Sequence, residues 1–110
     1  MPLTRNFKDT VKARAEADPE FRVGLFREAL EALLSDDLET GKVLLRDYVN
    51  ATVGFEALAA ELDKSPKSLM RMLSDKGNPR AGNLLGMVGH LKKREGVALS
   101  VSTAAEGLHA

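Results

Sequence analysis

The 110-residue chain has no cysteine, no tryptophan and only five aromatic side chains, four phenylalanines and one tyrosine. The absence of cysteine excludes disulfide bonds and thiolate zinc sites, and it fits a reducing compartment. No apolar run approaches the roughly 20 residues of a membrane-spanning helix. The segment from Met1 to Asp9 lacks the apolar stretch of a signal peptide. We therefore expect a soluble, cytoplasmic protein of about one domain.

Residue groups that carry catalysis are also missing. His90 and His109 are isolated, with no acid or cysteine at the spacing of a metal site. Glu28 and Glu31 are spaced like charges on a helix surface, and Asp36–Asp37 is better explained as a helix cap than as a catalytic pair. No Ser–His–acid group and no phosphate-binding loop stands out. We expect neither an enzyme nor a protein with a metal or cofactor.

What the chain does contain is an uneven distribution of charge. Its sixteen basic and sixteen acidic residues give a formal net charge of zero. Residues 64–94 nevertheless hold eight basic side chains and a single acid, Asp75, whereas residues 1–63 hold thirteen acidic and eight basic side chains. Such segregation suits a cationic face for a polyanion, with an acidic remainder for a basic protein partner. The plain alternative is a charge run that is merely solvated.

The spacing of apolar residues predicts helices nearly throughout the chain. They should cover about residues 5–17, 19–34, a segment that follows the cap signal Ser35–Asp36–Asp37 and runs to about 52, residues 55–62, a segment from Pro66 to the break at Lys76 and Gly77, and 79–95. The starts are marked by an N-cap residue followed by proline at Asp18–Pro19, Ser65–Pro66 and Asn78–Pro79. The expected inward side chains of the last two helices are Leu69, Met70, Met72 and Leu73, then Leu84, Leu85, Val88 and Leu91. The spacing of Lys42 and Arg46 carries no evident signal.

The C-terminal segment follows a different pattern. Gly96 is well placed to end the last helix. Val97, Leu99 and Val101 then alternate with small residues, which predicts a strand over 97–101. A single strand must pair with its copy in a dimer, pair with a partner's sheet, or not form. We expect residues 102–110 to be disordered, and we divide the chain into an N-terminal extension (1–36), a helical domain (37–96) and a short strand with a tail (97–110).

The segment from Gly54 to Arg80 predicts two short helices joined by a tight turn at Asp63 and Lys64. The second helix buries its apolar face and leaves Lys67, Ser68 and Arg71 pointing outward. Arginine can bind a guanine edge bidentately, serine donates or accepts, and lysine neutralises a phosphate or reaches a base. The plain alternative is an amphipathic helix with a solvated charged side.

These residues resemble a known pattern. The order Leu58–Ala59, Leu62, Ser65, Leu69, Gly77–Asn78–Pro79 and Leu84–Leu85 is similar to the Xre/Cro-type helix-turn-helix, the lambda-repressor-like fold. The stretches FKDTVKARAEADPEFR, LRDYVNATVGFEALA, KSPKSLMRML and KGNPRAGNL extend a resemblance to the HigA-like antitoxins, the addiction-module antidotes, over about residues 7–101.

The chain departs from the Xre/Cro pattern at three positions. Asp63 and Lys64 replace the usual glycine and aliphatic residue of the turn, and Gly54 stands where serine or threonine is common. Aspartate tolerates a left-handed conformation better than most residues, so the turn can still form.

The resemblance implies an all-α helix-turn-helix bundle, preceded by two N-terminal helices, that acts as a homodimer on a pseudo-palindromic operator. It places Lys67, Ser68 and Arg71 over base edges in the major groove. Near the phosphate backbone it places Ser65, Lys76, Asn78 and Arg80. We expect Lys64, where the chain departs from the pattern, to face solvent or phosphate and include it among the candidate DNA contacts. It also implies a cognate toxin, a small basic RelE/HigB-like ribonuclease, for which Phe21, Phe26 and Leu30 are our candidate contacts. The alternative for these three side chains is that they complete the core.

Three functions remain open at this point. The first is an antitoxin that neutralises its toxin and represses its own operon. The second is an Xre-type regulator with no toxin. The third is a helix-turn-helix used only for contacts with proteins.

Overall fold

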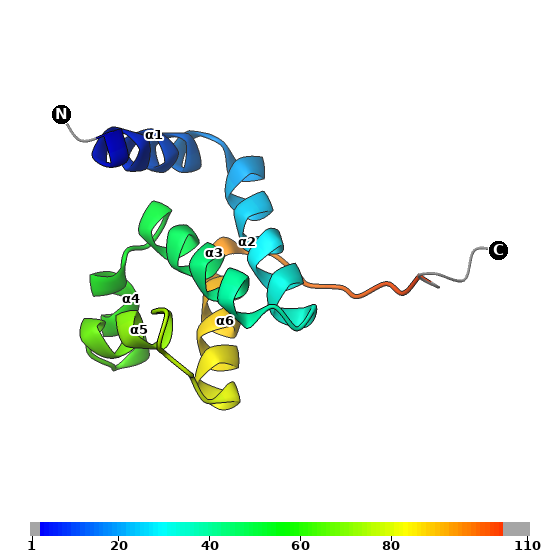
Figure 1. Cartoon of the computed structure of the whole chain (residues 1–110). Coiled ribbons are helices and arrows are strands. Elements are labelled where there is room, and N and C mark those ends of the chain that lie inside the picture. The colour runs from blue at the N-terminus through cyan, green and yellow to red at the C-terminus, as the bar shows by residue number, and fades with distance from the viewer. Residues whose placement is uncertain (1–2, 105–110) are drawn as a thin grey trace.

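The computed structural model describes residues 3–104, with side chains from residue 9 onward. Over this range the chain forms six α-helices and no strand (Figure 1). They are α1 (Leu3–Ala17), α2 (Pro19–Leu34), α3 (Leu38–Ala51), α4 (Phe55–Leu62), α5 (Pro66–Met72) and α6 (Ala81–Glu95). The prediction of an all-helical bundle is confirmed for this part of the chain.

Side-chain caps set the starts of α2 and α3. The carboxylate of Asp18 accepts hydrogen bonds from the backbone N–H groups of Glu20 and Phe21 at 3.0 and 3.3 Å, and Pro19 follows as the first residue of α2. Asp37 caps α3 in the same way, through the N–H of Thr40 at 3.2 Å. Each carboxylate satisfies donors that the helix itself leaves unpaired. The prediction of helix starts at these two acids is confirmed.

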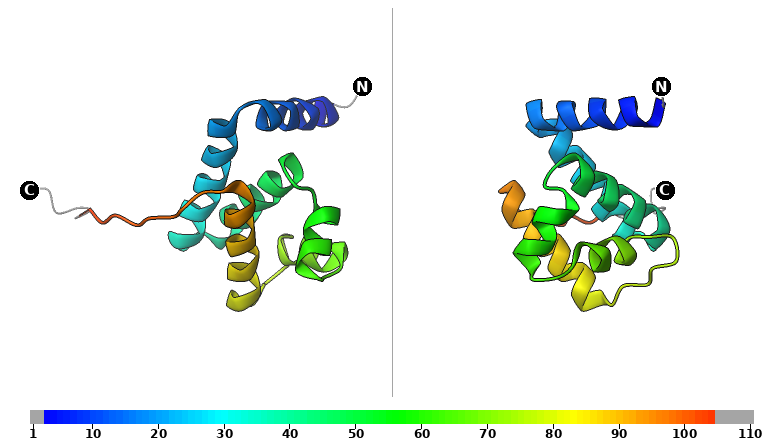
Figure 2. Two further views of the ribbon diagram at one scale, coloured as in Figure 1. Left: turned by 180° about the vertical axis from the view of Figure 1, so that it is seen from behind. Right: turned by 90° about the vertical axis from the view of Figure 1, so that its left-hand side faces the viewer.

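Five of the helices share one core. Helices α2 and α3 pack against each other, α4 and α5 form a second pair, and α6 runs beside them, while α1 lies across the far end of the bundle (Figures 1 and 2). The buried core side chains come from every helix between α2 and α6: Phe26, Ala29, Leu45, Tyr48, Val49, Phe55, Leu58, Ala59, Leu69, Leu73, Met87, Val88 and Leu91. Their removal from water is the main source of stability for the fold.

The N-terminal extension contributes to this core. Phe26 is 1% exposed and its ring lies 5.0 Å from that of Tyr48, so it is a core residue and is not available to a partner protein. Leu30 is partly buried against the same cluster. Phe21 is half-buried, with the guanidinium of Arg14 4.6 Å above its ring. The core alternative therefore holds for Phe26.

Two predicted inward side chains point outward instead. Met70 is 47% exposed and Leu85 is 64% exposed. The buried stripe of α6 runs through Met87, Val88 and Leu91. Because successive helical residues are rotated by about 100°, Leu85 lies away from this stripe. In the short helix α5 only one stripe can face the core, and Leu69 lies on it, which leaves Met70 on the outside.

The start of the last helix also differs from the prediction. Helix α6 begins at Ala81 with Arg80 at the N-cap position, so Asn78 and Pro79 belong to the preceding loop and do not begin the helix. A proline disfavours the helical conformation in the residue before it, which fits the position of Asn78 outside the helix. The other end agrees with expectation: Gly96 adopts the left-handed conformation and donates to the carbonyls of Lys92 and Lys93.

Residues 97–104 form neither helix nor strand. No strand forms over 97–101 in the single chain, which is one of the three alternatives left open for this segment, because no neighbouring segment offers it a ladder of hydrogen bonds. Val97 packs against the core, whereas Leu99 and Val101 are 51% and 85% exposed. Residues 105–110, which include His109 and most of the tail predicted to be disordered, lie outside the described residues.

Candidate nucleic-acid interface

The turn between α4 and α5 is built around two polar residues. Asp63 ends α4 in the left-handed conformation, with φ 57° and ψ 47°. The N–H of Lys64 then donates to the carbonyl of Ala59 at 2.9 Å. Ser65 caps α5, because its hydroxyl accepts from the N–H of Ser68 at 3.1 Å. The predictions of an aspartate turn and a serine cap are both confirmed.

Gly54 has a backbone reason to replace a capping residue. It precedes α4 with φ +83° and ψ +152°, a region that is accessible essentially to glycine alone. A serine here would have a side chain able to cap the helix but a strained backbone. The departure from the Xre/Cro pattern at this position therefore follows from the conformation of the chain.

Helices α4 and α5 approach closely through small and aliphatic side chains. Leu58, Ala59 and Leu69 are at most 1% exposed. Their packing fixes the orientation of α5 and directs its opposite side to solvent. Lys67, Ser68 and Arg71 are all exposed on that side. They lie at spacings of one, three and four residues, which places them on one helical face.

An open groove lies beside this face, between α5 and the loop that leads to α6. Its walls bring together six of the eight residues predicted to contact DNA: Lys64, Ser65, Ser68, Arg71, Lys76 and Asn78. Lys67 and Arg80 do not line the groove, although both are exposed. Asn83, near the start of α6, also lines it and was not predicted. An amide there can donate to phosphate or read a base edge.

The groove is cationic and its charges are unsatisfied. No carboxylate lines it. Among the side chains that the structure describes, none of its basic residues Lys64, Arg71 and Lys76 forms an ion pair. The same is true of Lys67 and Arg80 beside it. These five cations are therefore free to neutralise an anionic ligand without first breaking an internal contact.

The remaining cations of residues 64–94 lie elsewhere. Lys92, Lys93 and Arg94 occupy the last turn of α6, whose 15 residues place them roughly 20 Å from its start, where they complement the helix dipole. Arg94 is occupied by Glu61, with Nε 2.9 Å from Oε1, and His90 Nε2 lies 2.5 Å from the same oxygen. These contacts, that with His90 first, lower the pKa of Glu61. The positive stretch of sequence is thus not a single surface.

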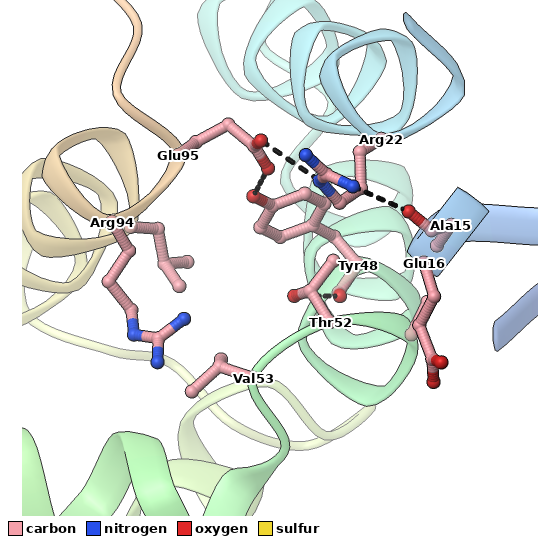
Figure 3. A pocket seen from close by; sticks show the side chains of 10 residues that line it. Ala15, Glu16, Arg22, Tyr48, Thr52, Val53, Arg94 and Glu95 are labelled. Carbon is pink, nitrogen blue, oxygen red and sulfur yellow. Dashed lines mark hydrogen bonds and ion pairs between the residues drawn. The ribbon is translucent and has the colours of Figure 1, made fainter. Parts of the chain in front are cut away.

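A second polar cluster joins the N-terminal helices to α6, beside a pocket at the far end of the bundle (Figure 3). Arg22 donates from Nε to Glu95 at 3.0 Å and from Nη1 to the carbonyl of Ala15 at 2.7 Å. The hydroxyl of Tyr48 donates to the other oxygen of Glu95. Burial, and then the contact with Glu95, raise the pKa of Tyr48, so the phenol remains protonated. The cluster holds α1, α2, α3 and α6 together.

Lys42 is the residue that sequence reasoning missed. Its side chain is 1% exposed, and its Nζ donates to the carbonyl oxygens of Gly77, Ser74 and Asp75 at 2.6, 2.9 and 3.3 Å. One signal was present: on a helix, position 42 lies on the same stripe as the buried Leu45 and Val49, where a lysine must find partners.

Comparison with known proteins adds no family to this description. No family model, no curated protein and no solved structure matches the chain. Within residues 3–104, no helix combines the length and apolar character needed to cross a bilayer. The same part of the chain contains no group of three or more histidine, cysteine, aspartate or glutamate side chains that could hold a metal ion.

Proposed function

We propose that this protein is a sequence-specific DNA-binding antitoxin, a homodimer with a helix-turn-helix of the Xre/Cro type, that represses its own operon. The observation that carries the DNA-binding part is the exposed outer face of α5 beside a groove lined by cations without partners. The resemblance to the HigA-like antitoxins carries the rest.

In this proposal α5 enters the major groove. Lys67, Ser68 and Arg71 share one exposed face, and their side chains match the donors and acceptors of base edges. An α-helix fits the width of the major groove of B-DNA. These three side chains therefore supply the sequence preference.

The surrounding residues bind the phosphate backbone. Lys64, Lys76 and Arg80 provide charge, while Ser65 and Asn78 provide hydrogen bonds. A single unit offers few phosphate contacts, so two copies on paired half-sites, about one helical turn apart, supply the rest of the affinity. A pseudo-palindromic operator matches the two-fold symmetry of such a dimer.

The toxin-binding part concerns the N-terminal helices. Because Phe26 is buried, we restrict the proposed contact to the exposed side of α1 and α2, with the partly buried Phe21 and Leu30 at its edge. Glu28 and Glu31 are exposed there and attract a small basic ribonuclease. Deletion of residues 1–36 would remove core side chains, so charge reversal is the better test.

The tests separate the parts of the proposal. An electrophoretic shift with a duplex of the DNA upstream of the gene should show binding that weakens steeply between about 50 and 200 mM salt. No shift at low salt would leave only a helix-turn-helix used for protein contacts. The antitoxin function predicts that the protein copurifies with the product of the neighbouring gene. A Glu28→Arg, Glu31→Arg variant should lose this partner and still bind DNA. DNA binding by the parent without such a partner would indicate a plain regulator.

A further inference from the structure

The loop between α5 and α6, residues 73–80, carries two of the proposed phosphate contacts but has no regular structure of its own. Lys76 and Asn78 are both exposed on it. Within it the N–H of Gly77 donates to the carbonyl of Ser74 at 3.0 Å, and Ser74 donates from N–H and Oγ to the carbonyl of Arg71 at 3.2 and 2.8 Å. These short-range bonds form a turn but do not attach it to the rest of the bundle, which requires contacts with its surroundings. The question is therefore what fixes it.

Lys42 of α3 supplies that contact. Its ammonium donates to three carbonyl oxygens of the loop, those of Ser74, Asp75 and Gly77, at 2.6 to 3.3 Å. The residues it binds directly flank Lys76. The carboxylate of Glu39, one turn earlier on α3, lies 3.2 Å from the same nitrogen.

Two further observations show how the loop is held, one at its start and one at Gly77. Arg46, one turn after Lys42, donates from Nη1 to the carbonyl of Leu73 at 3.3 Å. Gly77 lies so close to the end of α5 that a Cβ would stand 2.0 Å from the carbonyl oxygen of Arg71. The loop thus packs closely against α5 and is hydrogen-bonded to side chains of α3.

We propose that Lys42 is a positioning residue for DNA binding: through the carbonyls of residues 74, 75 and 77 it holds the loop so that Lys76 and Asn78 lie in the same groove as Ser68 and Arg71. The Lys42 side chain itself is buried and does not line the groove. This inference rests on the proposed DNA-binding function. Lys42 thus has a role in the interior of the protein, whereas a lysine is ordinarily expected at the surface.

The test is a double-mutant cycle on the duplex of upstream DNA. Lys76→Ala alone should weaken binding roughly fivefold and reduce the salt slope by about one unit. Lys42→Met should weaken it to a similar extent or more, although Lys42 is out of reach of DNA. Because both changes remove the same contact, adding Lys76→Ala to Lys42→Met should cost less than about twofold.

Arg71→Ala is the matched control, because Arg71 lies on α5, outside the segment whose carbonyls accept hydrogen bonds from Lys42. The fold-losses in DNA affinity caused by Arg71→Ala and Lys42→Met should therefore multiply in the double variant. If Lys76→Ala also multiplies with Lys42→Met, the two residues act independently and the proposal is overturned. If Lys42→Met does not fold, Lys42→Gln takes its place: its side chain is one bond shorter and offers two donors in place of three, so it weakens the contact with the loop without leaving an apolar group against the carbonyls. If neither Lys42→Met nor Lys42→Gln folds, Lys42 is required for the stability of the whole bundle, and the proposal is also overturned.

A second measurement does not depend on DNA. The backbone amide resonances of residues 74–78 should shift and broaden in Lys42→Met, while those of α4 remain unchanged. If the parent protein binds no DNA but these changes occur, the proposed function fails and the tie between Lys42 and the loop stands. If the parent binds DNA and the amides do not change, the positioning role is wrong and the proposed function stands.

Discussion

Gly77 offers the sharpest test of the described geometry, because replacing it with alanine should be far worse than the same change elsewhere. A Cβ at this position would lie 2.0 Å from the carbonyl oxygen of Arg71 and 2.9 Å from that of Met72. Both atoms belong to the backbone of α5, so no flexible side chain can move aside. The loop or the end of the helix must shift by more than 1 Å.

The cost can be worked out approximately. Overpacking in a tight site typically destabilises a protein by about 1–3 kcal/mol, and two backbone carbonyls put Gly77 at the upper end. For a chain of this size about 3 kcal/mol lowers Tm by roughly 12 °C. Because the loop carries Lys76 and Asn78, DNA affinity should fall too, even where the variant is folded.

Gly86 is the matched control. It lies inside α6, and a Cβ there would meet nothing within 4 Å. Alanine is the better helix former by roughly 0.5–1 kcal/mol, so Gly86→Ala should raise Tm by about 2–4 °C. Thermal unfolding followed by circular dichroism, at equal protein concentration, gives both values. Equal Tm values for Gly77→Ala and the parent would refute the close approach of the loop to α5.

Two further predictions concern α4. Gly54→Ser should destabilise the protein by about 1–2 kcal/mol, although serine is a good N-cap. The reason is that the backbone strain at φ +83° exceeds the few tenths of a kcal/mol that a serine cap gains over glycine. An increase in the midpoint of urea unfolding would contradict this prediction. The contacts with His90 and Arg94 lower the folded-state pKa of Glu61, so they stabilise the fold above its ordinary pKa of 4.5 and are lost as the pH falls through the folded value. Glu61→Gln should therefore flatten the loss of stability below about pH 4.5, and unchanged acid unfolding curves would show that the cluster contributes nothing.

Much of the fold could be predicted because local signals and packing agree. Asp18, Asp37 and Ser65 cap helices where their position before an apolar stripe indicated, and Gly96 ends α6 as expected. In each case a side chain or a backbone conformation acts within a few residues, so the sequence contains the whole cause.

The errors have tertiary causes. Asn78 and Pro79 carry a good helix-start signal, but they belong to a loop whose Gly77 carbonyl accepts from Lys42 of α3, and α6 begins later, at Ala81. Met70 and Leu85 have the right chemistry for the core but lie off the one stripe that each helix buries. The strand pattern at 97–101 needed a neighbour that the single chain does not offer.

Most of the exposed residues of the candidate site were predicted from the sequence, but the contact between Lys42 and the loop was not. Six of the eight expected residues line one groove. The helix period explains only Ser68 and Arg71, which share a face of α5, whereas Lys64, Ser65, Lys76 and Asn78 reach the groove from the turn before α5 and the loop after it. The tie from Lys42 could not be read from spacing, since its partners are backbone carbonyls more than thirty residues away.

The central claim is that the outer face of α5 reads DNA. The most direct measurement compares the parent with a Lys67→Ala, Arg71→Ala variant in binding to the duplex of upstream DNA across a range of salt concentrations. We predict that the folded variant loses at least about tenfold in affinity and that its salt dependence becomes shallower. A variant that binds this duplex as tightly as the parent, with the same salt slope, would contradict it.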